Sequence, residues 1–302
     1  PVVRTKSEDP AIAQHFIGIV RNTDDKQIGI SGMEEAFEPF LRSKQEERLL
    51  YHVDASGEPM FGFELRYSGF DNSFYPLTIQ TTIDASLQQK AEDILNKHEL
   101  EEGGLILLDV ETREVLVIAS RPNINVANPY ENNSIANRML QANYPGSVFK
   151  TVVALAAMEH LNVDPSRTFD CSLDVQGKEK AERDLGMLNF EQSFIQSCNR
   201  TFAQLATDLM EVDSNLLEEY AEKLGIIGPI GWKGDIFQYE SFQQFPQEEK
   251  GTVWGGEDIK EDPHLVRNSA IGQQNVRTTP MAVANTMATI ASLGIQKEVR
   301  GV

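Results

Sequence analysis

Residues 144–153 read Tyr-Pro-Gly-Ser-Val-Phe-Lys-Thr-Val-Val, and this stretch decides how the rest of the chain is interpreted. Ser147 and Lys150 are three residues apart, after a Pro-Gly break and at the head of a long apolar run. Because positions i and i+3 of a helix share a face, the hydroxyl lies beside the amine. A hydroxyl that passes its proton to a neighbouring base is a nucleophile for acyl transfer.

The Ser-x-x-Lys spacing is weak evidence alone, since a chain of this length contains about one such spacing by chance. The alternative interpretation is that Ser147 caps a helix and that Lys150 is solvated. The context favours burial, because residues 148–158 are apolar nearly all round and Lys150 is the only charge among them. Burial disfavours the charged form of a lysine, and the lowered pKa suits a general base.

A second motif lies at Ser197 and Asn199, the only Ser-x-Asn pair in the sequence, ahead of a periodic apolar stretch. Both residue types are favoured at helix starts, so a helix cap is again the alternative interpretation. In an acyl-transfer site, a second hydroxyl relays a proton between the lysine and the leaving group. A carboxamide holds the lysine and donates to a substrate carbonyl.

Together the motifs resemble the serine transpeptidase domain of penicillin-binding proteins, which shares its Ser-x-x-Lys signature with beta-lactamases. Further stretches are similar to family elements and follow in the family's order over residues 76–293. They are the domain opening at 77–88, a hairpin at 104–122, Asn137-Arg138 before the nucleophile, Gly272-Gln273 and the Thr-Pro helix at 279–284.

The resemblance implies a penicillin-binding D,D-transpeptidase that cross-links peptidoglycan stem peptides through an acyl-enzyme on Ser147. It implies that Lys150 is the base, that Ser197 relays the proton and that Asn199 binds substrate. Beta-lactam antibiotics and other cell-wall synthesis proteins are the partners it implies. The fold it implies is α+β, with an antiparallel sheet flanked by helices, as in beta-lactamases and transpeptidases.

Two other functions remain open on the sequence. A beta-lactamase or beta-lactam sensor of the same fold needs a base that activates water for deacylation. Four glutamates lie between the two motifs, in no pattern typical of such a base: Glu159, Glu179, Glu182 and Glu191. A non-catalytic cell-wall scaffold is the other alternative. The family's third motif, Lys-Thr-Gly on a later strand, is not found before Val302, so we expect either C-terminal strands beyond this sequence or a degenerate relative.

Composition excludes several other classes of function. The net charge of −19 disfavours nucleic acids and anionic membrane surfaces as partners, because both need a positive footprint. The histidines and cysteines show no metal-ligand spacing, so we expect neither a metal nor a cofactor. No apolar run is long enough for a transmembrane helix, and no signal peptide is visible. The resemblance implies a single N-terminal anchor and a location on the extracytoplasmic face of the bacterial membrane.

The length of 302 residues suggests about two domains. We expect part of a non-catalytic pedestal domain at 1–75 and the transpeptidase domain at 76–302. Within the first, we expect a strand at 16–20, a helix within 29–41 and a hairpin formed by 51–54 and 61–65.

Within the second domain, we expect a strand at 77–83, a helix at 84–98 and a hairpin with its turn at 111–114. Residues 121–145 read as a long loop, and 226–268 as surface loop. The sequence does not decide whether Cys171 and Cys198 form a disulfide or remain two free thiols. Cys198, between two site residues, is expected to be a small buried side chain rather than a second nucleophile.

Overall fold

The computed structural model describes residues 12–23, 26–41, 77–237, 239–256 and 259–302, with segments 48–50 and 66–68 and positions 56, 58 and 60. Every pair of named strands among these residues is antiparallel, and runs of helices and of strands follow one another along the chain. This is the α+β arrangement predicted from the sequence. Two isolated bridges, Glu114 with Arg300 and Gly231 with Val299, are parallel. The predicted hairpin at 51–65 lies outside the described residues, although the strands on either side of it, β3 and β4, pair with each other.

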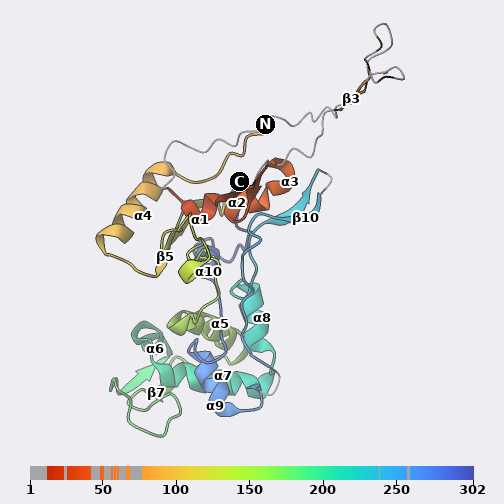
Figure 1. Cartoon of the computed structure of the whole chain (residues 1–302). Coiled ribbons are helices and arrows are strands. Elements are labelled where there is room, and N and C mark those ends of the chain that lie inside the picture. Colours follow the sequence, from red (N-terminus) through yellow and green to blue (C-terminus); the bar gives the residue numbers. More distant parts are fainter. Residues whose placement is uncertain are drawn as a thin grey trace.

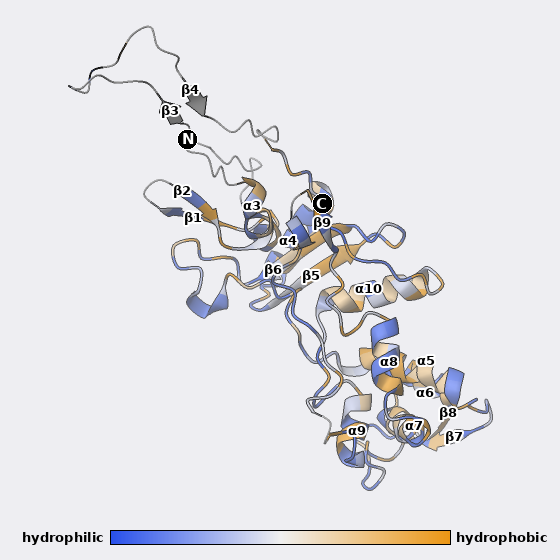
Figure 2. Cartoon of the chain, turned by 90° about the vertical axis from the view of Figure 1, so that its right-hand side faces the viewer, coloured by the Kyte–Doolittle hydropathy of each residue, from blue (hydrophilic) through white to orange (hydrophobic). Residues whose placement is uncertain are grey.

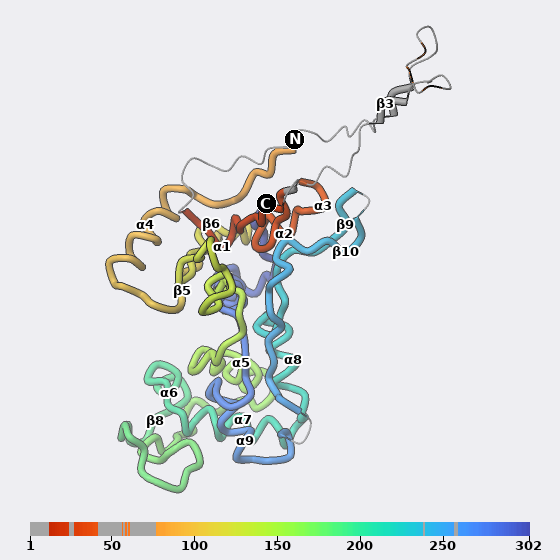
Figure 3. Tube along the Cα trace, in the orientation of Figure 1, coloured from red at the N-terminus to blue at the C-terminus, as the bar shows by residue number. Residues whose placement is uncertain are grey.

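The N-terminal part consists of short elements. They are α1 (Gln14–Ile17), β1 (Val20–Thr23), β2 (Lys26–Gly29), α2 (Gly32–Ala36), α3 (Glu38–Leu41), β3 (Arg48–Leu50) and β4 (Arg66–Ser68). The rings of Phe37 and Phe40 contact Phe242, with centroids 4.9 and 5.7 Å apart, from a hairpin far along the sequence. Figures 1 and 3 show this hairpin beside α2 and α3. The boundary between the two domains at residue 75 stays a prediction.

One layer of the main part is the hairpin of β5 (Gly103–Leu108) and β6 (Val115–Arg121), with α4 (Ala85–Lys97) against β6 and α10 (Pro280–Ala291) against β5. The helix and hairpin agree with the sequence prediction. Asp84 caps α4 by accepting from the Leu87 N–H at 2.9 Å. The buried amide of Gln88 joins helix to sheet, since it both donates to and accepts from the Ile118 backbone. Figure 2 shows the hydrophobic colour along both strands.

The other layer is mostly helical (Figure 1). Its elements are η2 (Gly146–Phe149), α5 (Lys150–His160), β7 (Thr168–Asp170), β8 (Met187–Asn189), α6 (Phe190–Gln196), α7 (Asn199–Val212), α8 (Leu216–Lys223) and α9 (Pro263–Ala270). The short helix η1 (Glu131–Asn133) and the hairpin of β9 (Lys233–Ile236) and β10 (Tyr239–Gln243) lie instead on the side of β5 and β6, near the N-terminal elements. No helix among the described residues has the length and apolar character needed to cross a membrane.

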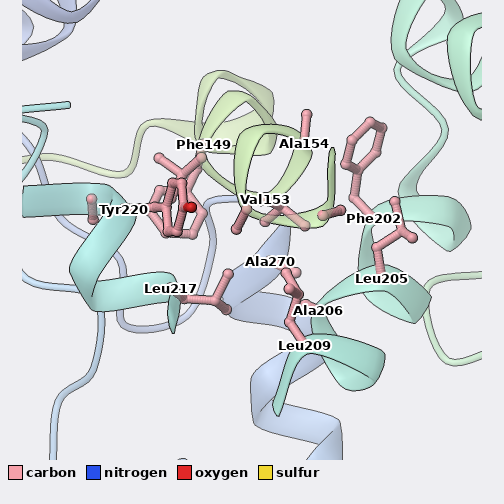
Figure 4. Close-up of a cluster of buried hydrophobic side chains, with 14 of the residues drawn as sticks. Phe149, Val153, Ala154, Phe202, Leu205, Ala206, Leu209, Leu217, Tyr220 and Ala270 are labelled. Atoms are coloured by element: carbon pink, nitrogen blue, oxygen red, sulfur yellow. The ribbon is translucent and has the colours of Figure 1, made fainter. Parts of the chain in front are cut away.

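Helix α5 lies at the centre of this layer, and six of its eleven residues are buried, Lys150 among them. Leu155 and Met158 are 39% and 61% exposed, so the helix is not buried on nearly all sides, contrary to the prediction from its apolar composition. Side chains of α5, α7, α8 and α9 meet in one apolar cluster that includes Val153, Phe202, Leu205, Leu217 and Ala270. Figure 4 shows these side chains directed toward one another from the four helices. The cluster fixes the start of α5 relative to the start of α7.

Two predicted strands are wrong. Residues 16–20 contain the end of α1, because Gly18 adopts a φ of 87° and ends the helix, and β1 begins only at Val20. Residues 77–83 are extended but not part of a strand. The Thr82 N–H donates to Gly301 O in the C-terminal segment at 3.0 Å. The region 226–268 is also more ordered than expected, since it holds β9 and β10 and the start of α9.

A close approach of two glycines holds η2 in place. The Gly146 N–H donates to Gly272 O at 3.0 Å, and both glycines have positive φ, 56° and 72°. A Cβ at Gly272 would lie 1.9 Å from the Gly146 carbonyl oxygen, so any side chain there displaces the η2 backbone. Gly186, with a φ of 64°, has no neighbouring atom within 4 Å of the same position.

We therefore predict that Gly272→Ala lowers the free energy of unfolding by about 3 kcal/mol or more, because backbone strain and overpacking add. The matched variant Gly186→Ala, which carries the backbone strain without the clash, should lose about 1 kcal/mol. Urea denaturation of both variants measures the difference. Equal losses of unfolding free energy in the two variants would show that the contact between Gly146 and Gly272 does not exclude a side chain at position 272.

Candidate active site

The predicted nucleophile lies in a single turn of 3-10 helix. Ser147 belongs to η2, and α5 begins at Lys150, so the two side chains share one face across the junction. The Lys150 Nζ lies 3.1 Å from the Ser147 Oγ. The side chain of Lys150 is buried, with only 2% of the residue exposed. The predicted pairing of a hydroxyl with a buried amine is therefore present in the structure.

The predicted pair Ser197 and Asn199 converges on the same amine. The Lys150 Nζ lies 2.9 Å from the Ser197 Oγ, 2.8 Å from its carbonyl oxygen and 2.6 Å from the Asn199 Oδ1. The Ser197 Oγ also donates to the Ser147 Oγ at 3.0 Å. All four residues predicted from the sequence thus meet at one point. A proton can pass between the two hydroxyls and the amine without any of these groups moving far.

An unusual backbone conformation brings Ser197 into this position. Helix α6 ends at Gln196, Ser197 is left-handed with φ 57° and ψ 44°, and α7 begins at Asn199. Left-handed conformations are uncommon for residues other than glycine and are frequent at functional sites. The reversal at Ser197 directs its carbonyl, its hydroxyl and the Asn199 carboxamide toward the same amine.

The two cysteines form a disulfide, which settles the question that the sequence left open. Cys171, directly after β7, is bonded to Cys198, which lies between Ser197 and Asn199, and both are buried. As predicted, Cys198 is a small buried side chain. The Thr201 Oγ1 lies 3.4 Å from the Cys171 Sγ and donates to the Ser193 Oγ at 2.8 Å. The disulfide therefore fixes the turn that carries both site residues.

The electrostatics of the site favour a free amine. Burial, with a smaller contribution from the positive charge of Arg183, lowers the pKa of Lys150 to about 8. Among the described residues, no carboxylate forms an ion pair with Lys150. The ring of Phe202 lies under the amine, 5.6 Å from its centroid, and closes the apolar side of the site. An amine with a pKa near 8 is a competent general base at neutral pH.

Sequence reasoning missed three contributors to this site. Arg183 and Cys171 lie in other elements, and only the fold brings them to Lys150 and its partners. Phe202 lies on α7, three residues after Asn199, and its ring reaches Lys150 through the packing of α7 on α5. Of these three, only Cys171 could have been found from the sequence. Cys198 lies between two predicted site residues, so a disulfide to Cys171 would hold both of them in place. No group of three or more His, Cys, Asp or Glu side chains suited to a metal ion occurs in the described part of the chain.

A serine hydroxyl, a buried amine, a second hydroxyl and a carboxamide are the groups that acyl transfer on a serine would require. The comparisons narrow this class of reaction. The family model described as "Penicillin binding protein transpeptidase domain" matches residues 103–302. The chain belongs to this transpeptidase family of penicillin-binding proteins, as the sequence resemblance predicted.

Curated relatives carry the name peptidoglycan D,D-transpeptidase FtsI. The protein of Escherichia coli K12 is 25% identical over 304 residues, which cover 95% of this chain and 46% of that protein. The protein of Buchnera aphidicola is 28% identical over 152 residues, or 49% of this chain and 26% of that protein. The chain thus spans about half the length of its E. coli relative.

Solved structures confirm the fold at low sequence identity. Penicillin-binding protein PBP2 of Helicobacter pylori, solved in complex with MreC, has a TM-score of 0.70 at 20% identity, covering 97% of this chain and 57% of that one. PBP2 of Pseudomonas aeruginosa, solved with WCK 5153, has a TM-score of 0.69 at 19% identity, covering 100% and 68%. These likenesses establish the α+β transpeptidase-like fold.

The lowered pKa of Lys150 predicts how acylation of Ser147 depends on pH. The reaction needs the unprotonated amine, so its rate should rise about tenfold per pH unit below pH 8 and level off above it. Arg183→Gln removes a repulsive positive charge, raises the pKa of Lys150 and should move the midpoint to higher pH. Stopped-time intact mass spectrometry with a penicillin measures both profiles.

Lys90→Gln is the control for Arg183→Gln, because it makes the same change in net charge at an exposed position on α4. Its midpoint should equal that of the unmodified protein. If Arg183→Gln leaves the midpoint unchanged as well, the charge of Arg183 does not act on Lys150.

The disulfide predicts a second measurable effect. Cys171→Ser should lower the free energy of unfolding by about 3 kcal/mol, the usual contribution for a loop of 27 residues. It should also slow acylation of Ser147, because Ser197 and Asn199 lose their anchor. Thiol reduction of the unmodified protein should reproduce both changes. A variant with unaltered acylation would show that the disulfide stabilises the fold without positioning the site.

Proposed function

We propose that this protein is a serine D,D-transpeptidase that cross-links peptidoglycan stem peptides. One observation carries the proposal: the buried Lys150 Nζ lies within 3.1 Å of the Ser147 Oγ, the Ser197 Oγ and the Asn199 Oδ1. This arrangement can deprotonate a nucleophile, relay the proton and hold the amine. Membership of the transpeptidase family supports the same activity.

The geometry supports the following course of acylation. The Lys150 amine takes the proton from the Ser147 hydroxyl, and the Ser147 oxygen attacks the carbonyl of the penultimate D-alanine. The bond to the terminal D-alanine then breaks, and the Ser197 hydroxyl passes a proton to the leaving nitrogen while it regains one from Lys150. The contact of 3.0 Å between the two hydroxyls suits this relay.

The second half-reaction returns the enzyme to its starting state. The amine of a neighbouring stem peptide attacks the acyl-enzyme carbonyl and loses its proton to the same relay. The new peptide bond forms as the Ser147 oxygen leaves and is protonated. The Asn199 carboxamide accepts from Lys150 through its oxygen, so its NH₂ group stays available to donate to the donor peptide.

Penicillins are expected to acylate Ser147 and to remain attached. Rapid hydrolysis requires a base that activates water beside the acyl-enzyme, and no described carboxylate hydrogen-bonds to Ser147, Lys150 or Ser197. Of the glutamates between the motifs, Glu159 interacts instead with Tyr220. This argues for the transpeptidase over a beta-lactamase, the first alternative.

We place the natural protein on the extracytoplasmic face of the membrane, where its substrate is assembled, with other cell-wall synthesis proteins as partners. The likeness to a PBP2 solved in a complex with MreC supports a partner of that kind. A non-catalytic scaffold, the second alternative, would share this location and these partners and would lack an acylatable serine.

The test is intact mass spectrometry after incubation with benzylpenicillin. We predict a stable mass increase of one drug molecule per chain, because deacylation lacks a water-activating base. Ser147→Ala should abolish the adduct, and Ser214→Ala, at an exposed serine on the turn before α8, should retain it. Persistence of the adduct in Ser147→Ala would overturn the assignment. A rapidly lost adduct would favour the beta-lactamase. The absence of any adduct, both on this sequence and on the protein extended past Val302, would favour the scaffold.

A further inference from the structure

A stacked arginine lies beside the nucleophile segment and takes no part in the reaction described above. The guanidinium carbon of Arg277 lies 3.7 Å from the centroid of the Tyr144 ring, the shortest cation–ring distance among the described residues. Tyr144 is 54% exposed and precedes Ser147 by three residues, so its Cα is at most about 11 Å from that of the nucleophile. The pair therefore lies at the solvent-accessible approach to the site.

The backbone holds this pair rigidly against η2. Asn143 and Thr278 exchange two backbone hydrogen bonds of 2.9 Å, which set Tyr144 and Arg277 next to each other. On its other side, Arg277 exchanges backbone bonds of 2.8 and 2.9 Å with Thr252. The contact of Gly146 with Gly272 pins the following residues of the same segment. A guanidinium held at its face and at its backbone loses little entropy when it binds a ligand.

The charge of Arg277 is not used within the described structure. Arg121, Arg138 and Arg167 each form an ion pair with a carboxylate at 2.7 to 2.9 Å. Arg277 has no ion pair and no side-chain hydrogen bond among the described residues, and its only side-chain interaction is the Tyr144 ring. The net charge of the chain is −19, yet no described carboxylate pairs with this guanidinium beside the site. The guanidinium of Arg277 is therefore suited to bind an anionic ligand.

We propose that Arg277, positioned by Tyr144, binds a carboxylate of the donor peptide on the acyl side of the bond that breaks. This inference rests on the proposed function and adds a substrate class to it: acyl donors with a negative charge near the reacting carbonyl. Stacking occupies the face of the guanidinium and leaves the N–H groups at its edge for a two-pronged bond to a carboxylate. A carboxylate on the acyl side stays bound through both half-reactions.

The test compares two penicillins that differ by one carboxylate: benzylpenicillin and its α-carboxy derivative, whose extra charge lies on the acyl side chain. The rate of Ser147 acylation is measured by intact mass for each drug. We expect Arg277→Gln to slow acylation by the α-carboxy derivative about tenfold, the usual size of a lost charge-assisted hydrogen bond. Acylation by benzylpenicillin should change less than twofold, and this drug also reports that the variant is folded.

The matched control is Arg21→Gln. Arg21 of β1 also pairs with a tyrosine, with its guanidinium carbon 5.9 Å from the centroid of the Tyr130 ring, and its loss changes the net charge equally. It should leave both rates unaltered. Tyr144→Leu, which keeps Arg277 and removes its support, should give an intermediate loss for the α-carboxy derivative alone.

The outcomes separate this inference from the proposed function. If both penicillins acylate Ser147 and Arg277→Gln slows them equally or not at all, the carboxylate subsite is wrong and the transpeptidase proposal stands. If Arg21→Gln has the same selective effect as Arg277→Gln, the effect is one of net charge, and the subsite is again wrong. If neither drug acylates the unmodified protein, both the function and the subsite are contradicted.

Discussion

The burial of one amine is the constraint on which the active site depends. Lys150 is 2% exposed and lies in an apolar helix, so its Nζ must find hydrogen-bond partners inside the protein. It finds the side chains of Ser147, Ser197 and Asn199, and the carbonyl of Ser197. Because these partners come from two separate segments, the fold has to hold the start of α5 against the turn between α6 and α7.

Several features around the amine meet this requirement by restricting the backbone. Ser197 takes a left-handed conformation, so α6 ends and α7 begins within two residues. The disulfide at Cys198 ties that turn to Cys171, and the contact of two glycines fixes η2. Each of these features restricts a main-chain position directly beside a reacting group. Rigid positioning of this kind is what catalysis by proton relay needs, because a small displacement breaks the hydrogen-bonded path.

Local patterns predicted the elements whose stability is local. The helix at 85–97 and the hairpin of β5 and β6 have clear periodicity, and the burial of Lys150 follows from the apolar run around it. The prediction at 16–20 was wrong because a short apolar run suits a helix as well as a strand. The prediction at 77–83 was wrong because alternation alone does not supply the partner strand that a segment needs. The contact between Ser147 and Ser197 cannot be predicted from hydrophobic periodicity, and only the family resemblance predicted it. Arg183, Phe202 and the Arg277–Tyr144 pair depend on the assembled fold and had no local signal.

The distribution of charge follows from the same amine. A carboxylate beside Lys150 would stabilise its ammonium form, raise its pKa and remove the base. Burial and Arg183 act in the opposite direction, and they bring the pKa to about 8 in a chain that is strongly acidic elsewhere. A donor peptide with its own carboxylate would bring into the site the negative charge that the fold excludes. A guanidinium at the approach to the nucleophile offsets that charge, so an anionic donor can bind without raising the pKa of Lys150.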